Sequence, residues 1–304
     1  MDRNLAEKAG IPFHAIYTGK LRRYFSLRNF IDPFLVLIGF FQSLYHLLRF
    51  RPNLVFSKGG FVSLPVTLAA FVLRIPVVLH ECDSVMGLAN RISSRFARKI
   101  ATAFPILSKN PKVVFVGNPL RPEIFEGSRE EGFKLTGFTE GKPVLLVWGG
   151  SQGAKQINQF VERGLPQLST VFQVILIAGT SKTLTLEDAP LKQFEFVGEE
   201  LKHLYAITDL AVGRAGANSL FELAALRIPN IAIPLPNADQ LSNAAFFENA
   251  GASLMVRDTN TLENTLISLW NDAEKRHLMQ SAQKKLVSRD ASEKLINLFQ
   301  DILS

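Results

Sequence analysis

Short, unbroken apolar runs that alternate with helical stretches most constrain what this chain can fold into. A strand with one solvated face alternates apolar and polar residues, whereas a parallel strand covered on both faces is apolar throughout. The alternation of such strands with helices predicts an α/β fold made of doubly wound, parallel sheets. The predicted strands are Phe13–Tyr17, Leu54–Phe56, Val77–Leu79, Ile100–Ala103, Val113–Val116, Val144–Val147, Val174–Ile177, Phe194–Val197, Leu210–Val212 and Ile231–Ile233.

A change of composition near residues 121–142 separates two halves of the chain. The 304 residues leave room for two domains of ordinary size. A polar, glutamate-rich stretch follows Arg121, and Gly141-Lys142-Pro143 opens the next predicted strand. We therefore predict a Rossmann-like domain over residues 1–121, a linker over 122–142 and a second Rossmann-like domain over 143–304, with a cleft between the two.

The two halves differ in charge. Residues 1–120 contain 16 Lys and Arg against 5 Asp and Glu, whereas residues 121–304 contain 18 against 22. A basic half on an otherwise acidic chain indicates an anionic surface as partner. The sequence contains no zinc finger, RNP-type motif or continuous basic helix, so we favour anionic lipid and expect no nucleic acid. The single cysteine, Cys82, excludes an intrachain disulfide, as fits a reducing cytosol.

An apolar helix is predicted from Asp32-Pro33, which read as N-cap and first helical residue, to the helix-ending Pro52. Its apolar surface is wider than one domain core requires. A span needs ~17–25 residues, and this run barely reaches that length before the next strand, so we disfavour a membrane crossing. A helix buried on both sides is one alternative, and a helix with one face on lipid is preferred. The predicted membrane residues are Phe34, Leu37, Ile38 and Phe41, with Arg22, Arg23 and Arg28 at the headgroups.

Glycines follow three predicted strands where each meets a helix. The three joints are residues 57–61 with Gly59 and Gly60, residues 149–154, and residues 213–218. Glycine lets the backbone turn tightly, and the free N–H groups of a helix N-terminus attract an anion. Ordinary tight turns are the alternative for any one joint, but three at equivalent strand ends favour phosphate binding. None is a Walker A loop or a full dinucleotide fingerprint, so a nicotinamide cofactor is poorly supported.

Glu222 lies about one turn into the helix that follows the third joint. A carboxylate at this place can accept two hydrogen bonds from vicinal hydroxyls, such as those of a ribose. A solvated glutamate favoured by the helix dipole is the alternative. The glycine joint just before it favours ribose binding.

Six segments together resemble the MurG family, the GT-B glycosyltransferases that transfer N-acetylglucosamine from UDP-N-acetylglucosamine to lipid I in peptidoglycan synthesis. The resemblance covers nearly the whole chain. Each segment alone is weak, but together they are very specific. They are Ser57–Pro65, Ile75–Asn90, Val116–Arg121, Gly149–Asn158, Arg214–Glu222 and Pro234–Ala244.

The resemblance implies a donor site in the second domain. Ser151 and Gln152 would lie at the diphosphate with Arg121 close by, and the Val197 backbone would read the uracil edge. Glu222 would bind the ribose, and Asp83, Gln240 and Asn243 would lie near the sugar. Further residues implied at the ribose and N-acetylglucosamine are Ala217, Asn218, Ser219, Leu220 and Phe221. Gly59 and Gly60 would belong to the acceptor and phosphate side.

The resemblance also implies the reaction and the partners. It is an inverting transfer, in which His80 with Glu81 is one hypothesis for the base and a structural histidine is the alternative. We expect no metal and no other cofactor. Lipid I, an anionic membrane surface and other cell-wall synthesis proteins are the expected partners, at the cytoplasmic face of the membrane. The last helix is expected to pack back on the first domain.

Two departures from the family accompany this interpretation. The family's opening strand and glycine-rich loop ending in histidine have no match here, so the first domain is expected to be incomplete. Asp239 stands where His or Gln is commoner. The competing hypotheses are another GT-B enzyme, such as a diacylglycerol glycosyltransferase or a UDP-N-acetylglucosamine 2-epimerase, and a membrane-bound UDP-sugar-binding protein without transfer activity.

Overall fold

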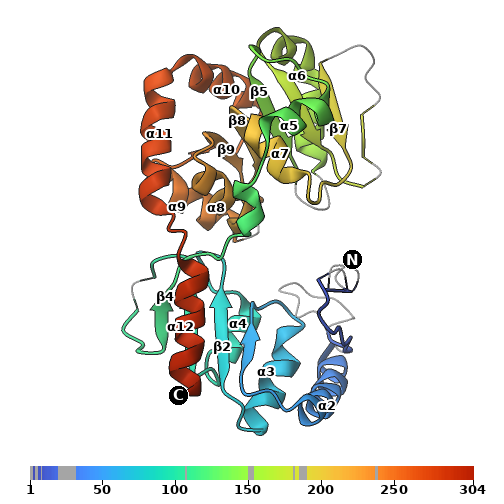
Figure 1. The fold of residues 1–304 in the computed structure, drawn as a ribbon, viewed down its shortest axis with the longest axis vertical. Helices are drawn as coiled ribbons and strands as arrows, with labels where there is room; N and C mark the ends of the chain where they lie inside the picture. Colours follow the sequence, from blue (N-terminus) through green and yellow to red (C-terminus); the bar gives the residue numbers. More distant parts are fainter. Residues whose placement is uncertain are drawn as a thin grey trace. The chain divides into compact units, whose positions relative to one another are not determined.

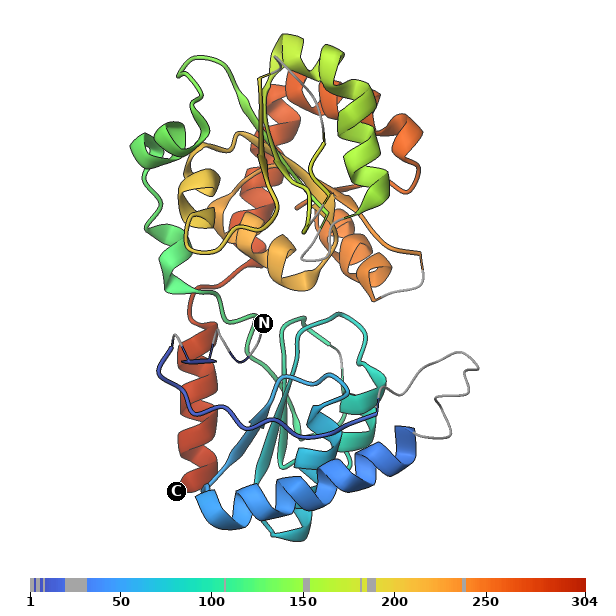
Figure 2. The ribbon, with the colours of Figure 1, turned by 90° about the vertical axis from the view of Figure 1, so that its right-hand side faces the viewer.

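The computed structural model describes residues 3, 6–7, 9–19, 32–106, 108–149, 154–180, 182–184, 190–236 and 239–304. These residues form two compact units. The first unit contains residues up to Cys82, residues Met86–Val116 and the C-terminal segment Glu293–Ser304, and the second contains Asp83–Val85 and Gly117–Ser292. Figures 1 and 2 show the α/β character of each unit.

The first unit is a four-stranded parallel sheet in the order β1-β2-β3-β4. Alternate residues of its strands face two separate cores. Leu79 packs with Ala70 on one face, while Val78 packs with Leu295 and Leu298 on the other. The C-terminal helix thus covers one face of this sheet (Figure 1). The elements are α2 (Asp32–Phe50), β1 (Val55–Ser57), α3 (Ser63–Val72), β2 (Val77–Glu81), α4 (Leu88–Ser93), β3 (Lys99–Thr102), β4 (Val113–Phe115) and α12 (Ala291–Leu303).

The predicted strand Phe13–Tyr17 is wrong. Residues 11–19 have no regular secondary structure and belong to neither sheet. Instead of pairing with a strand, the Tyr17 N–H donates to the Gln42 side chain of α2. The backbone of this segment also passes so close to α2 that a Cβ built on Gly39 would lie 2.0 Å from the Tyr17 carbonyl oxygen. The dark-blue segment ends beside the start of α2 in Figure 2.

Helix α2 buries only a narrow face. Gly39 and Ser43 are buried on the side that packs on α3. The four apolar residues predicted to meet the membrane are all exposed, with relative accessibilities of 68% for Phe34, 52% for Leu37, 46% for Ile38 and 60% for Phe41. Burial of this helix on both sides is therefore excluded within its own unit. Among the described residues, α2 alone is long and apolar enough to cross a membrane, by length and composition only.

The second unit is a six-stranded parallel sheet in the order β10-β9-β8-β5-β6-β7. Along β5, Leu145 and Val147 face one core, whereas Val144 and Leu146 face the other. Both faces are covered, as the unbroken apolar runs predicted. The elements are η2 (Pro122–Phe125), α5 (Arg129–Thr136), β5 (Val144–Trp148), α6 (Lys155–Val171), β6 (Gln173–Ile177), β7 (Leu191–Phe194), α7 (Leu201–Ile207), β8 (Leu210–Arg214), α8 (Ala217–Leu226), β9 (Asn230–Ile233), α9 (Gln240–Asn249), β10 (Leu254–Met255), η3 (Thr259–Thr261), α10 (Leu262–Asn271) and α11 (Ala273–Leu286).

The stretch predicted as a linker, residues 122–142, contains structure of its own. The Ser128 side chain accepts from the Glu131 N–H and caps α5. Gly127 and Gly132 let this stretch approach α7 closely, because a Cβ at either position would lie within 2.4 Å of a carbonyl oxygen of α7. These residues are thus packed into the second unit.

Candidate functional site

A pocket of about 330 Å³ lies at the carboxyl edge of the second unit's sheet. Ligands of doubly wound sheets bind at this edge. The sheet supplies apolar side chains to it, and helix α8 supplies polar ones. The lining residues are Leu146 and Trp148 of β5, Ile177 of β6, Glu195, Phe196 and Val197 after β7, Leu201 and Tyr205 of α7, Asn218, Ser219 and Glu222 of α8, and Arg121.

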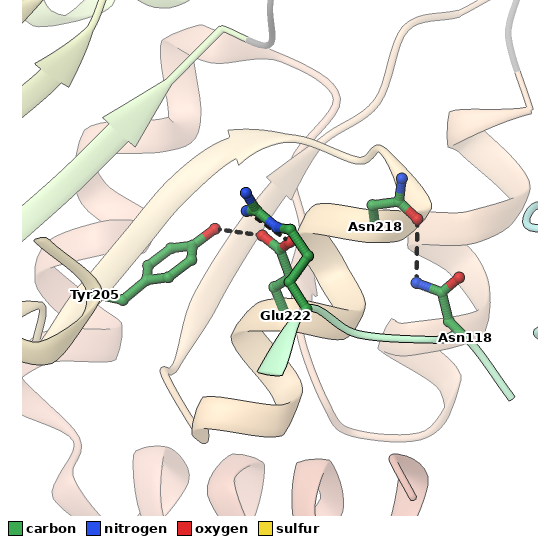
Figure 3. Close-up of polar contacts among 5 residues, drawn as sticks. Asn118, Tyr205, Asn218 and Glu222 are labelled. Atoms are coloured by element: carbon green, nitrogen blue, oxygen red, sulfur yellow. Dashed lines mark hydrogen bonds and ion pairs between the residues drawn. The ribbon is translucent and has the colours of Figure 1, made fainter. Parts of the chain in front are cut away.

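Two side chains hold the Glu222 carboxylate, and Figure 3 shows the contact with Tyr205. The Arg121 guanidinium lies 3.1 Å from Oε1, and the Tyr205 hydroxyl donates to Oε2 over 3.0 Å. The Glu222 side chain is 12% exposed. A carboxylate has about four acceptor positions, so two remain after these contacts. That number matches the two vicinal hydroxyls of a ribose.

Tyr205 is kept as a hydrogen-bond donor by its surroundings. Burial raises the pKa of its hydroxyl well above the ordinary value of 10.0, and the adjacent Glu222 carboxylate raises it further, against a smaller lowering by Arg121. The hydroxyl therefore stays protonated across the physiological range. Its proton points at Glu222, which keeps that carboxylate in one orientation.

A second contact fixes the start of α8. The Asn118 side-chain amide donates to Asn218 Oδ1 over 3.1 Å, also visible in Figure 3. Of the residues that the family resemblance placed around the ribose and sugar, Asn218, Ser219 and Glu222 line the pocket. The side chains of Ala217, Leu220 and Phe221 are buried in the unit, so only their backbone is available to a ligand.

Asn243, also named from the resemblance, is fully buried and joins three segments. Its amide donates to Asp83 Oδ1 over 2.8 Å and to the Ala215 carbonyl, and its Oδ1 accepts from the Ser84 N–H. The pKa of Asp83 is raised, mainly by burial and also by the Asp239 carboxylate, against the lowering effect of the Asn243 bond. Asn243 thus holds Asp83 and the loop before α8 in place.

Comparison with known families assigns both halves of the chain. Residues 1–102 match the glycosyltransferase family 28 N-terminal domain, and residues 144–297 match the glycosyltransferase family 28 C-terminal domain. The chain belongs to glycosyltransferase family 28. The predicted α/β fold with two Rossmann-like domains is that of this family, and it is confirmed.

Individual family 28 relatives cover nearly all of the chain. The UDP-N-acetylglucosamine–N-acetylmuramyl-(pentapeptide) pyrophosphoryl-undecaprenol N-acetylglucosamine transferase of Clostridium kluyveri is 40% identical over 99% of this chain and 88% of the relative. The crystal structure of Acinetobacter baumannii MurG superimposes with a TM-score of 0.75 at 25% identity, covering 99% of this chain and 88% of that one. These matches confirm the resemblance to the MurG family.

A more distant structure shares only the fold. UDP-GlcNAc 2-epimerase from Neisseria meningitidis superimposes with a TM-score of 0.69 at 15% identity, covering 92% of this chain and 84% of that one. The enzyme class predicted from the sequence, a glycosyltransferase, is confirmed by the family 28 domains.

Two residues predicted at the donor diphosphate, Ser151 and Gln152, lie outside the described residues. So do Arg22, Arg23 and Arg28, which were predicted to meet lipid headgroups. Gln240 is described, and its Oε1 accepts from the Leu235 N–H at the start of α9. Within the described ranges, no three His, Cys, Asp or Glu side chains are grouped as metal ligands would be.

The glycine turn of the first unit is held by a buried carboxylate. Gly59 and Gly60 both have positive φ, and a Cβ on Gly59 would lie 2.6 Å from the Asn90 amide nitrogen. That amide donates to Glu81 Oε2 over 2.9 Å, and the Gly87 N–H donates to the same oxygen. Glu81 therefore fixes the Asn90 side chain, which packs against the glycine turn. This structural role of Glu81 differs from the predicted role of orienting a catalytic base.

His80 is completely buried in β2, with its Nδ1 3.2 Å from Cys82 Sγ. An imidazole in that position has no exposed nitrogen to receive a proton from an acceptor hydroxyl. Its burial favours the structural alternative over the predicted base.

Four polar or aromatic residues that line the pocket were not singled out from the sequence: Trp148, Glu195, Phe196 and Tyr205. Asn118, which bonds to Asn218, and Arg214 were not singled out either. Arg214 is buried at the end of β8, where it donates to the Ile233 carbonyl and to Gln156 Oε1. Burial lowers the pKa of its guanidinium. The sequence signal that Trp148 and Arg214 share is their place as the last residue of an otherwise apolar strand.

Proposed function

We propose that this family 28 protein transfers N-acetylglucosamine from UDP-N-acetylglucosamine to a polyprenyl-pyrophosphoryl-MurNAc-peptide, lipid I, with inversion at the anomeric carbon. The observation that carries the proposal is the Glu222 carboxylate, held by Arg121 and Tyr205 in an apolar pocket of nucleoside size. The relatives named above as N-acetylglucosamine transferases support the substrate pair.

The donor nucleotide would occupy the second unit. The two free acceptor positions of Glu222 bind the ribose hydroxyls. The uracil extends over the apolar floor, where the backbone at Val197 offers hydrogen bonds to its edge. The diphosphate would lie at the N-terminus of α6, which begins at Lys155 and whose positive end favours an anion. The same positive end stabilises the diphosphate as it leaves.

Asp83 and Gln240 would contact the hydroxyls of the N-acetylglucosamine. Asn243 keeps Asp83 in place by donating to its carboxylate. The acceptor belongs to the first unit, where the Gly60 N–H of the glycine turn would donate to its pyrophosphate. The Gly59 N–H already donates to Ser57 Oγ. The acceptor hydroxyl oxygen then forms a bond to the anomeric carbon while the bond from that carbon to UDP breaks on the opposite face. The hydroxyl proton passes to a general base.

A transfer assay tests this proposal. The chain is incubated with radiolabelled UDP-N-acetylglucosamine and a lipid I analogue, and the label is expected in the lipid product. Conversion of the nucleotide sugar without the acceptor would instead favour the epimerase hypothesis. Nucleotide binding without either reaction would favour a non-catalytic binding protein, and both outcomes would refute the proposed transfer.

The acceptor is lipid-linked, so we also propose that α2 docks on an anionic membrane surface at the cytoplasmic face. Phe34, Leu37, Ile38 and Phe41 form one exposed apolar stripe on this helix. An apolar helix face flanked by basic residues is typical of interfacial binding. Each apolar side chain buried in lipid contributes about 1.5–3 kcal/mol, which is enough to make binding sensitive to single substitutions.

Flotation with anionic vesicles tests the membrane surface. The wild-type chain is expected to float at low salt and less at high salt. Leu37→Ser is expected to weaken flotation about tenfold or more. Leu278→Ser on α11 is the matched control, because Leu278 is a leucine of similar exposure (61%) in the second unit. Equal loss for both variants, or no wild-type binding at low salt, would contradict the assignment.

A further inference from the structure

Trp148 ends the central strand β5 in an unusual environment. Its register partner on β8 is Gly213, and a Cβ built on that glycine would lie 2.2 Å from indole Cδ2 and 2.3 Å from Cε2. The indole therefore lies flat over the neighbouring strand, in the space that a side chain at position 213 would otherwise fill. Only glycine at 213 permits this placement.

The indole is also part of a ligand surface. It is only partly buried, and with Leu146 and Ile177 it forms the sheet side of the pocket that contains Glu222. At about 330 Å³, this pocket is near the lower end of the 300–1,000 Å³ of typical small-molecule sites. Trp148 is the largest of the side chains on that floor, so it limits how deep a ligand can enter.

We propose that Trp148 is a specificity residue that sets the depth of the nucleobase pocket, so that the pocket accepts a pyrimidine and excludes the larger fused ring of a purine. The inference rests on the proposed function, because it assumes a nucleotide with its ribose at Glu222. A base that extends from that ribose lies over the indole face. Aromatic faces pair well with the flat face of any base, so size rather than stacking makes the distinction.

Competition binding tests the depth. The dissociation constants of UDP and ADP are measured for the wild type and for Trp148→Val, which leaves more room above Gly213. The ratio of the ADP constant to the UDP constant is expected to fall about tenfold or more, the scale on which a shaped apolar pocket discriminates. Trp270→Phe is the control, because Trp270 packs against Phe172 of the other core and the variant should keep the wild-type ratio.

Intrinsic fluorescence gives a second readout that does not depend on the valine variant folding. The chain has 2 tryptophans, so Trp270→Phe leaves only Trp148 and Trp148→Phe leaves only Trp270. UDP is expected to change the emission of the first variant and to leave that of the second unchanged. The reverse pattern would overturn the proposal.

The outcomes separate this inference from the function on which it rests. UDP binding by the wild type with an unchanged ADP-to-UDP ratio in Trp148→Val would overturn the inference alone. Failure of the wild-type chain to bind UDP would overturn the proposed function and the inference with it.

Discussion

The hydroxyl of Tyr205 offers the sharpest test of how the site is built. Tyr205→Phe removes one oxygen, and the ring stays within the core formed by Leu204, Ile207 and their neighbours. Tyr205 is 8% exposed, and its hydroxyl donates to Glu222 over 3.0 Å. The substitution therefore removes one hydrogen bond to a carboxylate with little change in packing.

The size of the effect follows from that bond. A hydrogen bond to a charged group contributes about 1.5–3 kcal/mol to stability. Glu222 retains Arg121 as a partner, but the phenylalanine ring offers no donor in place of the lost hydroxyl. We expect a loss of about 1.5–3 kcal/mol in the free energy of unfolding. For a domain of this size that corresponds to a fall in Tm of about 2–4 °C per kcal/mol.

The loss should also depend on pH. Burial holds the folded-state pKa of Tyr205 well above 10.0, the value expected in the unfolded chain. Above pH 10 the unfolded state loses this proton while the folded state keeps it, so folding becomes less favourable as the pH rises. The stability that Tyr205 contributes is thus fully present below pH 10 and declines above it. Tyr205→Phe has no such proton, so the gap between wild type and variant should narrow in that range.

Urea unfolding followed by tryptophan fluorescence measures this gap, because Trp148 and Trp270 both lie in the second unit. The measurement is made at several values from pH 7 to about pH 11, where tyrosine titration begins to matter. Equal stability of the two proteins at pH 7 would refute the hydrogen bond's contribution. A gap that stays constant above pH 10 would refute the assigned pKa direction.

Three further perturbations follow from the same contacts. Asp83→Asn removes a carboxyl whose pKa is raised from 3.8 by burial. The wild type becomes less stable as the pH rises from about 4 through the raised pKa, so thermal denaturation should show the variant gaining stability relative to the wild type over that range. A difference in stability that does not depend on pH would contradict this. Glu81→Ala leaves the buried Asn90 amide without its carboxylate, so unfolding followed by circular dichroism should show a loss of about 1–3 kcal/mol, with Glu81→Gln retaining more stability; equal losses would contradict the contact. Gly213→Ala should cost about 1–3 kcal/mol in the wild type and much less beside Trp148→Val, and additive effects in this double-mutant cycle would contradict the indole placement.

The sequence predicted most of the fold because the parallel strands are covered on both faces. Val144–Val147 and Leu210–Val212 lie within the observed β5 and β8. The strand predictions were poorer at the edges of the second unit's sheet, where the strands are only partly buried. Strand β7 was placed about three residues late, because its Lys192 and Gln193 are only partly buried at the sheet edge and interrupt the apolar run. Strand β10 has two residues and gives no pattern.

From the sequence, a site residue could be proposed only where its type and its neighbours in the chain already suggest a chemical role. Glu222 follows a glycine joint on a helix, and both features are visible in the sequence. The partners of Glu222 depend on tertiary structure, because α7 must pack beside α8 before Tyr205 can reach the carboxylate. Trp148 resembles one more apolar residue of a strand until Gly213 is known to be its neighbour. For His80 the sequence left a catalytic base and a structural histidine as alternatives, because two adjacent residues do not show how deeply a strand is buried.

The central claim is that Glu222 binds the ribose of a uridine nucleotide, and calorimetry with UDP and 2′,3′-dideoxy-UDP tests it most directly. For the wild type, removal of the two hydroxyls should weaken binding by about 1–3 kcal/mol, or 5- to 150-fold. Glu222→Ala should weaken UDP binding by a similar amount and should no longer distinguish the two ligands. Unchanged UDP affinity in Glu222→Ala, or a full loss from the missing hydroxyls in both proteins, would contradict the account.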